Sequence, residues 1–338
     1  RFAMAYQTGY SRETAMPPIV ERRGKMKKTL SIALILALLV ICVTAFTACT
    51  GNDELTILFE QDDDLKNTYS VIAVNPDAPF DTTNEVNINK EGADAFINWL
   101  SLKSTRELIA SFGVESHGEK LFYLQEDATV KDVEIPKATS DTKEIALSTT
   151  TSVNDSGLMA FILPAFEKTY GYKVNVASAG TGAAIKAAEM GNADLILVHS
   201  KASEEAFVNA GFARKVAGFS AERISFMYNY FVLVGPKADP ANVEQSANIK
   251  EAFAAIADAK LTFISRGDKS GTHNAEVKLW DKELGITNDV SALPEEIKDW
   301  YISAGQGMGA CLNMAAEKQG YILSDKATFL TYKKNLAK

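Results

Sequence analysis

The stretch that sets the fold class is Glu144–Ser200, EIALSTTTSVNDSGLMAFILPAFEKTYGYKVNVASAGTGAAIKAAEMGNADLILVHS. Three short apolar runs, EIALSTTT, KVNVASAG and ADLILVHS, alternate with two longer helix-like runs, LMAFILPAFEKTYG and AAIKAAEMG. Strands that alternate with helices of this length are typical of βαβ units, in which neighbouring strands run parallel. The stretch therefore predicts an α/β fold with a largely parallel sheet.

Further strand-like and helix-like runs flank this stretch. Upstream, the sequence predicts two strands and then two helices: LTILF (55–59), YSVIAV (69–74), GADAFINWLSL (92–102) and STRELIASFG (104–113). Downstream, it predicts two strands, MYNYFVLVGP (227–236) and LTFIS (261–265). It also predicts helices at SEEAFVNAG (203–211), 249–259, NAEVKLWDKEL (274–284) and CLNMAAEKQG (311–320). Residues 125–143 are charged and poor in apolar residues, so we expect them to form a linker.

The composition is that of a soluble globular protein. The chain has 338 residues, enough for two domains, with 46% hydrophobic and 23% charged residues. Its net charge of −8 argues against a nucleic-acid partner, because such proteins usually present a basic face. A small anionic ligand is not excluded, since a few local donors can dominate one site despite the global charge.

Residues 26–49 have the pattern of a lipoprotein signal peptide. Lys27 and Lys28 precede an apolar run from 30 to 46, and Thr47-Ala48-Cys49 follows. We therefore expect cleavage before Cys49, lipidation of Cys49 and an extracytoplasmic location, as a cell-membrane lipoprotein or a periplasmic protein. An uncleaved anchor and a plain signal peptide are the alternatives. Residues 1–25 are predicted to be upstream sequence without structure.

Cysteines and histidines offer no metal or disulfide pattern. Of the three cysteines, Cys42 and Cys49 fall in the signal segment, which leaves Cys311 without a partner. The histidines at 117, 199 and 273 are scattered and lack metal-ligand spacing. We therefore expect neither a metal nor a cofactor.

Three predicted strands end in turns that are rich in hydrogen-bond donors. These turns are STTTS (148–152), SAGTG (178–182) and SRGDKSGTH (265–273). In parallel α/β sheets, ligands bind beyond the carboxyl ends of the strands. Backbone N–H groups at helix starts, serine and threonine hydroxyls and the planar fork of Arg266 all suit an anion. Together the turns predict an anion site.

Each turn alone has a simpler interpretation. STTTS is suited to helix capping, SAGTG to a tight turn, and Arg266 to a surface pair with Asp268. The convergence of all three favours the anion site. Enzyme motifs for nucleotide, zinc or serine chemistry (GxxxxGK[ST], HExxH, GxSxG) are missing from the sequence. His199-Ser200 is a poor base–nucleophile pair, because adjacent strand residues point to opposite faces.

Several of these motifs, taken together, are specific. STTTSVNDSG, SAGTG, GNADLILVHS, MYNYFVLVGP, SRGDKSGTH and AGQGMG resemble the tungstate-binding proteins of ABC importers, the TupA type, over residues 144–338. The resemblance implies a two-lobed periplasmic-binding-protein fold of type II that is not an enzyme. It implies a ligand between lobes that close by hinge motion. It also implies an ABC permease as partner, and we expect a monomer.

The order of the segments differs from that family. The segment 55–113 resembles one that comes last in the family, so the resemblance implies a circular permutation; a joining error in the sequence is the alternative. Lobe 1 would then comprise 69–228, including the linker 125–143. Lobe 2 would comprise 55–66 and 232–338, with the chain crossing between lobes near 66–69 and 227–231.

The resemblance also implies a set of anion ligands. Carried over motif by motif, they are Thr150, Ser152, Thr181, Arg266, Ser270, Gly271 and Thr272, with Arg223 in ERISFMYNY as a further candidate. Tyr230 stands where the family usually has an acidic residue, which puts the affinity in doubt.

The ligand class has alternatives. A fully deprotonated oxyanion such as tungstate or molybdate needs donors only, whereas phosphate keeps a proton at neutral pH and benefits from a carboxylate acceptor. Asp268 is the nearest candidate for that acceptor. A phosphate- or sulfate-binding receptor of the same fold is therefore the alternative within this class. Outside it stand a sensory or adhesion role and an extracytoplasmic hydrolase.

Overall fold

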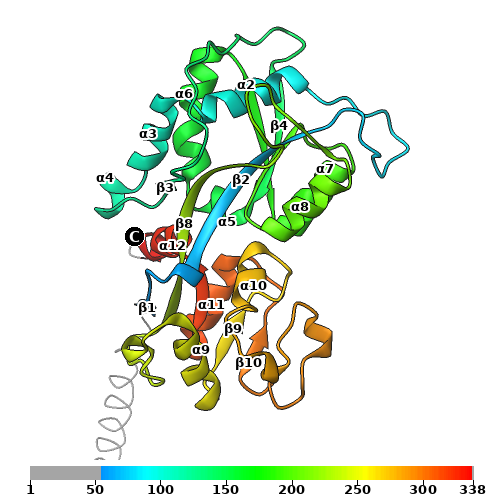
Figure 1. Ribbon diagram of the computed structural model, residues 1–338. Helices are drawn as coiled ribbons and strands as arrows, with labels where there is room; N and C mark the ends of the chain where they lie inside the picture. The colour runs from blue at the N-terminus through cyan, green and yellow to red at the C-terminus, as the bar shows by residue number, and fades with distance from the viewer. Residues whose placement is uncertain (1–54, 337–338) are drawn as a thin grey trace, which may run out of the picture. The chain divides into compact units, whose positions relative to one another are not determined.

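The computed structural model describes residues 55–336, in which two long strands run through both lobes. These strands are β2 (Lys66–Val74) and β8 (Ile224–Pro236), and Figure 1 shows them side by side between the upper and lower parts. They pair antiparallel from Lys66 opposite Tyr230 to Tyr69 opposite Met227. The register shifts between Tyr69 and Ser70, which marks an irregularity at the crossing point.

Lobe 1 is built on a mixed sheet with the order β8-β2-β6-β4-β5. Its inner strands are β4 (Glu144–Thr150), β5 (Lys173–Ala179) and β6 (Leu195–Val198), and β4 runs parallel to both neighbours. β2 is antiparallel to β6, so the sheet is parallel only where the stretch 144–200 builds it. Short strands β3 (Tyr123–Leu124) and β7 (Ala213–Arg214) pair with β8 and β2.

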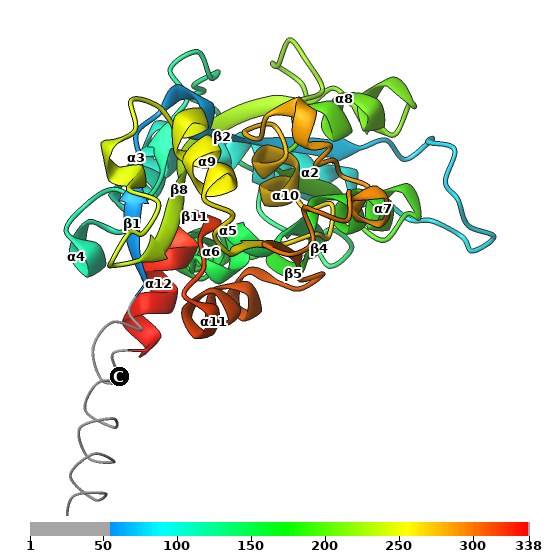
Figure 2. The same ribbon diagram turned by 90° about the horizontal axis from the view of Figure 1, so that it is seen from below.

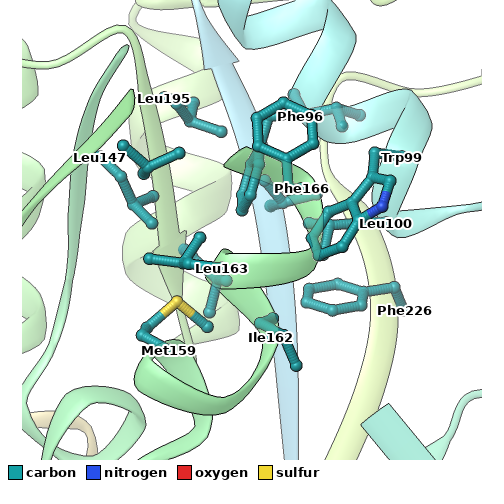
Figure 3. Close-up of a cluster of buried hydrophobic side chains, with 14 of the residues drawn as sticks. Phe96, Trp99, Leu100, Leu147, Met159, Ile162, Leu163, Phe166, Leu195 and Phe226 are labelled. Carbon is teal, nitrogen blue, oxygen red and sulfur yellow. The ribbon is translucent and has the colours of Figure 1, made fainter. Parts of the chain in front are cut away.

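Helices cover both faces of this sheet. They are α2 (Lys90–Leu100), α3 (Lys103–Ser111), α4 (Val114–His117), α5 (Thr151–Asp155), α6 (Leu158–Tyr170), α7 (Thr181–Glu189) and α8 (Lys201–Asn209). Alternation along β6 explains the two layers, because Leu195 and Leu197 join one hydrophobic cluster while Ile196 and Val198 join another. In the first cluster, Phe96 of α2 packs edge-on against Phe166 of α6, with ring centroids 5.2 Å apart (Figure 3).

Lobe 2 gathers around the C-terminal half of β8. Figure 2 shows β1 (Leu55–Phe59), β8 and β11 (Ile322–Asp325) side by side, and β1 and β11 both pair antiparallel with β8. A separate parallel pair is formed by β9 (Phe263–Ser265) and β10 (Tyr301–Ser303). The remaining elements are α9 (Ile249–Asp258), α10 (Gly271–Glu276), α11 (Met308–Lys318), α12 (Lys326–Leu336) and four 3₁₀ turns (Asp63–Leu65, Val243–Gln245, Lys282–Leu284 and Val290–Ala292).

The predicted linker 125–143 contains no helix or strand, but it is packed against lobe 1. Ile135 is only 6% exposed and belongs to the larger core cluster. Lys131 Nζ donates to Asn98 Oδ1 at 2.7 Å and to the carbonyl of Ala217. Ile135 and Lys131 therefore fix the segment to lobe 1, although its overall composition is charged. One aliphatic side chain and one lysine with an apolar stem are enough to hold an irregular segment in place.

The predicted signal segment 26–49, the lipidation site Cys49 and residues 1–25 lie outside the described residues. Between residues 55 and 336, no helix has both the length and the apolar character that a membrane crossing requires.

Candidate oxyanion-binding site

The three donor-rich turns meet where the lobes face each other. Arg266 Nη1, in the turn after β9 of lobe 2, donates to Thr151 Oγ1 of lobe 1 at 3.3 Å. A Cβ placed on Gly180 of lobe 1 would lie 3.7 Å from Ser270 Cβ of lobe 2, which is ordinary van der Waals contact. The turns of the two lobes are therefore in contact.

The candidate ligands in these turns are withdrawn from solvent. Exposure is 5% or less for Thr150, Ser152, Thr181, Arg266, Ser270 and Thr272. Within residues 55–336, Arg266 Nε and Thr181 Oγ1 are buried and have no hydrogen-bond partner. Such groups are costly, and buried polar atoms in folded proteins almost always have a partner. An oxyanion accepts hydrogen bonds from N–H and O–H groups, so these two groups fit such a ligand.

The carboxylate of Asp268 accepts hydrogen bonds from two residues of its own turn. Its Oδ2 accepts from Arg266 Nη2 at 2.5 Å, and its Oδ1 accepts from the backbone N–H of Ser270 at 3.1 Å. The pair between Arg266 and Asp268 therefore exists, but it is not a surface pair, since Arg266 is only 4% exposed. Asp268 orients the guanidinium and the start of α10, and each of its oxygens accepts one hydrogen bond.

Glycine is required at one place in this turn. Gly267 has φ +61°, a conformation that side chains rarely adopt, and a Cβ there would lie 1.9 Å from Ser303 Oγ. The close approach lets the turn pack onto β10. Ser270 then caps α10, because its Oγ accepts from the N–H of His273 at 3.3 Å.

His199 lies directly behind these hydroxyls, at the end of β6. Its Nε2 is 3.4 Å from Ser152 Oγ, and its Nδ1 is 2.7 Å from Asn67 Oδ1. Ser152 Oγ is in turn 3.0 Å from Thr150 Oγ1. Burial, aided by the nearby positive charge of Arg266, lowers the pKa of His199 to about 3. The imidazole is therefore neutral at physiological pH.

A chain of buried polar groups fixes which nitrogen of His199 carries the proton. The carboxylate of Asp325 accepts from Asn229 Nδ2 and from Tyr69 OH, the latter at 3.0 Å. Asn229 Oδ1 is thus left to accept from Asn67 Nδ2 at 2.9 Å, which leaves Asn67 Oδ1 as an acceptor for His199 Nδ1. Nε2 is consequently the acceptor nitrogen. We call this set the hinge network: Asn67, Tyr69, His199, Asn229 and Asp325.

Arg223 takes a different position from the other candidates. Its Nε donates to Glu204 Oε2 at 2.5 Å, and its Nη1 donates to Ser225 Oγ at 2.9 Å, both within lobe 1. Arg223 lines a cavity of about 470 Å³, which His199 of lobe 1 and Gly271 of lobe 2 also line. Its role as an anion ligand stays a prediction, as do the roles of the seven residues in the three turns.

Sequence reasoning missed Thr151 and the hinge network. Thr151 lies inside STTTS, where four neighbouring hydroxyls gave no means of choosing between them. Asn67, Asn229 and Asp325 come from three distant segments, and only the pairing of β2 with β8 brings the first two together. The sequence places His199 beside Ser200, whereas its contacts are with Ser152 and Asn67.

The described residues contain no group of three or more histidine, cysteine or acidic side chains that could hold a metal ion. Cys311 is buried, and burial raises the pKa of its thiol to about 11. The three turns themselves offer serine and threonine hydroxyls and the guanidinium of Arg266.

Comparison with known proteins relates most of the chain to two tungstate-binding relatives. It is 46% identical over 194 residues to the tungstate-binding protein TupA of Peptoclostridium acidaminophilum, which covers 57% of this chain and 62% of the relative. It is 40% identical over 184 residues to TupA of Campylobacter jejuni, which covers 54% of this chain and 62% of the relative. The matched segment thus spans less than two thirds of either relative.

A solved structure is also similar in sequence. The crystal structure of the tungstate ABC transporter from Geobacter sulfurreducens is 42% identical, over 57% of this chain and 76% of that chain, with a TM-score of 0.48. A family model matches residues 136–338 and does not extend to residues 55–135, so the permuted segment order stays a prediction. That model describes a PBP superfamily domain, which confirms the predicted fold. The chain belongs to the PBP superfamily.

Proposed function

We propose that this protein is an extracytoplasmic solute-binding protein that captures tungstate for an ABC importer. Molybdate, which is nearly the same size as tungstate, is included in the proposal. The observation that carries the proposal is the pair of buried donors where the two lobes meet, Arg266 Nε and Thr181 Oγ1, which have no partner among the described residues. Relatives named tungstate-binding proteins support the same ligand. A permease partner, a monomeric state and a lipid anchor at Cys49 belong to this proposal, as does the permuted order.

Closure of the lobes would assemble the site. Lobe 1 supplies Thr181 and the turn that carries Thr150 and Ser152, and lobe 2 supplies Arg266 and Ser270. With the lobes apart, water satisfies these donors; with the lobes together, a bound oxyanion takes its place. Charge-assisted hydrogen bonds strengthen when water is excluded, so ligand and closure stabilise each other.

The hydrogen bonds of Asp268 make it a weaker acceptor for a protonated phosphate, although each carboxylate oxygen has a second lone pair and can accept again. A protonated phosphate has an O–H group that needs an acceptor, and Asp268 already receives Arg266 Nη2 and the N–H of Ser270. Sulfate is not disfavoured in this way, because it too is fully deprotonated. Size alone would separate it from tungstate.

One arrangement bears on the alternative of a hydrolase. Ser152, His199 and Asn67 stand in the order of a nucleophile, a base and an orienting group. However, a general base works best with a pKa near the working pH, whereas the pKa of His199 is about 3. The constellation therefore suits binding better than catalysis.

Calorimetry tests the proposal on the chain from Thr50 onward. We expect tungstate and molybdate to bind more tightly than sulfate or phosphate, and tungstate to raise the melting temperature. Ligand at about 100 times its Kd stabilises the folded state by about 2.7 kcal/mol through mass action. A rise with phosphate and none with millimolar tungstate would move the assignment to the alternative receptor.

A further inference from the structure

Three surfaces of the imidazole of His199 are in contact with different parts of the protein. One face stacks on Tyr69 of β2, with ring centroids 4.9 Å apart. Nδ1 contacts Asn67 of the same strand, and Nε2 contacts Ser152 of lobe 1. The ring thus touches both a lobe-crossing strand and a predicted anion ligand.

A further contact of the imidazole comes from lobe 2. A Cβ built on Gly271, the first residue of α10, would lie 2.3 Å from His199 Cε1 and 2.5 Å from its Nε2. Gly271 has no positive φ, so its backbone conformation does not demand glycine. Glycine is required at position 271 because the imidazole of His199 leaves no space for a Cβ atom. The backbone of lobe 2 therefore lies directly on the imidazole when the lobes are together.

We propose that His199 is a positioning residue, which anchors the hydroxyl of Ser152 and so fixes the turn STTTS, and which requires glycine at 271 for the lobes to close. This rests on the proposed function. The hinge network fixes the neutral tautomer, so Nε2 always presents a lone pair to Ser152 Oγ. Ser152 Oγ therefore donates its proton to Nε2, and it can accept a hydrogen bond from Thr150 Oγ1, 3.0 Å away. When the lobes close, the backbone of Gly271 packs against the imidazole ring and holds it in place.

The inference makes a specific claim about shape. A methyl group at position 271 would occupy the volume of the ring, so the closed form would be lost or distorted. Removing the ring would free that volume but would also remove the support of Ser152. Each single change should therefore weaken binding, and the second change should partly repair the first.

The test compares four variants with the wild type by calorimetry against tungstate. Overpacking of this kind typically costs enough to lower affinity about 10- to 100-fold, which we expect for Gly271→Ala. The double variant Gly271→Ala/His199→Ala should bind more tightly than Gly271→Ala alone. His199→Gln, which retains an acceptor in the side chain, should bind more tightly than His199→Ala. Small-angle X-ray scattering with saturating tungstate should show less compaction for Gly271→Ala than for the wild type.

Gly309→Ala is the matched control, because Gly309 also lies in the first turn of a lobe 2 helix and a Cβ there meets no atom within 4 Å. Its affinity should equal that of the wild type. Wild-type affinity in Gly271→Ala, or equal affinities for His199→Gln and His199→Ala, would overturn the inference. The His199 pair decides the matter even where Gly271→Ala does not fold. Failure of the wild type to bind any oxyanion would instead overturn the proposed function.

Discussion

Arg266→Ala is expected to lower the affinity for tungstate by about 2–5 kcal/mol, the usual cost of removing one partner of a buried charged pair. This corresponds to about 30- to 4,000-fold in Kd. The side chain is 4% exposed and contacts Thr151 of the opposite lobe and Asp268 of its own turn. Its removal takes away a donor fork and leaves the carboxylate of Asp268 without its cation, so an incoming anion would be repelled.

Calorimetry measures this loss, and thermal unfolding without ligand checks that the variant is folded. Arg266→Lys is also expected to bind weakly, because an ammonium group cannot reproduce the planar fork. Arg214→Ala is the control: that arginine pairs with Asp94 at 2.6 Å within lobe 1 and contacts none of the three turns in the described structure. Near-normal affinity in Arg266→Ala would place this residue outside the site.

Two buried groups near the site are expected to give opposite pH dependences of stability. Burial raises the pKa of Glu276 to about 7, although Ser265, Trp280 and Tyr301 donate to it. Its contribution to stability is complete below its unfolded pKa of 4.5 and is lost as the pH rises through 7. The pKa of His199 is lowered to about 3, so its contribution is complete above 6.5 and is lost as the pH falls toward 3.

Between pH 7 and pH 5 each group changes the free energy of unfolding by about 2 kcal/mol, with opposite signs. In the wild type the two effects nearly cancel. His199→Gln should therefore gain stability on acidification relative to the wild type, whereas Glu276→Gln should lose it. Denaturant unfolding at the two pH values measures the difference between the variants, expected at about 4 kcal/mol. Equal pH responses in both variants would contradict the assignment.

The local parts of the fold were predictable from the sequence, because each depends on a few neighbouring residues. The alternation in 144–200 predicts β4, α6, β5, α7 and β6, and the donor-rich turns mark the strand ends that meet between the lobes. The predicted helix at 274–284 is wrong beyond Glu276, where α10 ends. That carboxylate is turned inward to Ser265, Trp280 and Tyr301, contacts that helical periodicity does not reveal.

The parts that could not be predicted depend on contacts between distant segments. Asn67 meets Asn229 across 162 positions of sequence, and Tyr69 meets Asp325 across 256. The sheet of lobe 1 is mixed and not largely parallel, because β2 enters it antiparallel beside β6. Likewise, Arg266 next to Asp268 is typical of a surface pair until burial by the other lobe is known.

If Cys49 carries a lipid, the position of β1 would limit how the protein stands on a membrane. β1 begins at Leu55, and five residues, 50–54, separate it from Cys49. An extended chain of this length spans at most about 20 Å. If Cys49 is lipidated, the short segment 50–54 would therefore hold the edge of lobe 2 close to the bilayer surface. Opening and closing of the cleft would then swing lobe 1 above a nearly stationary lobe 2, so the face offered to a membrane-embedded transporter would be set by the tether.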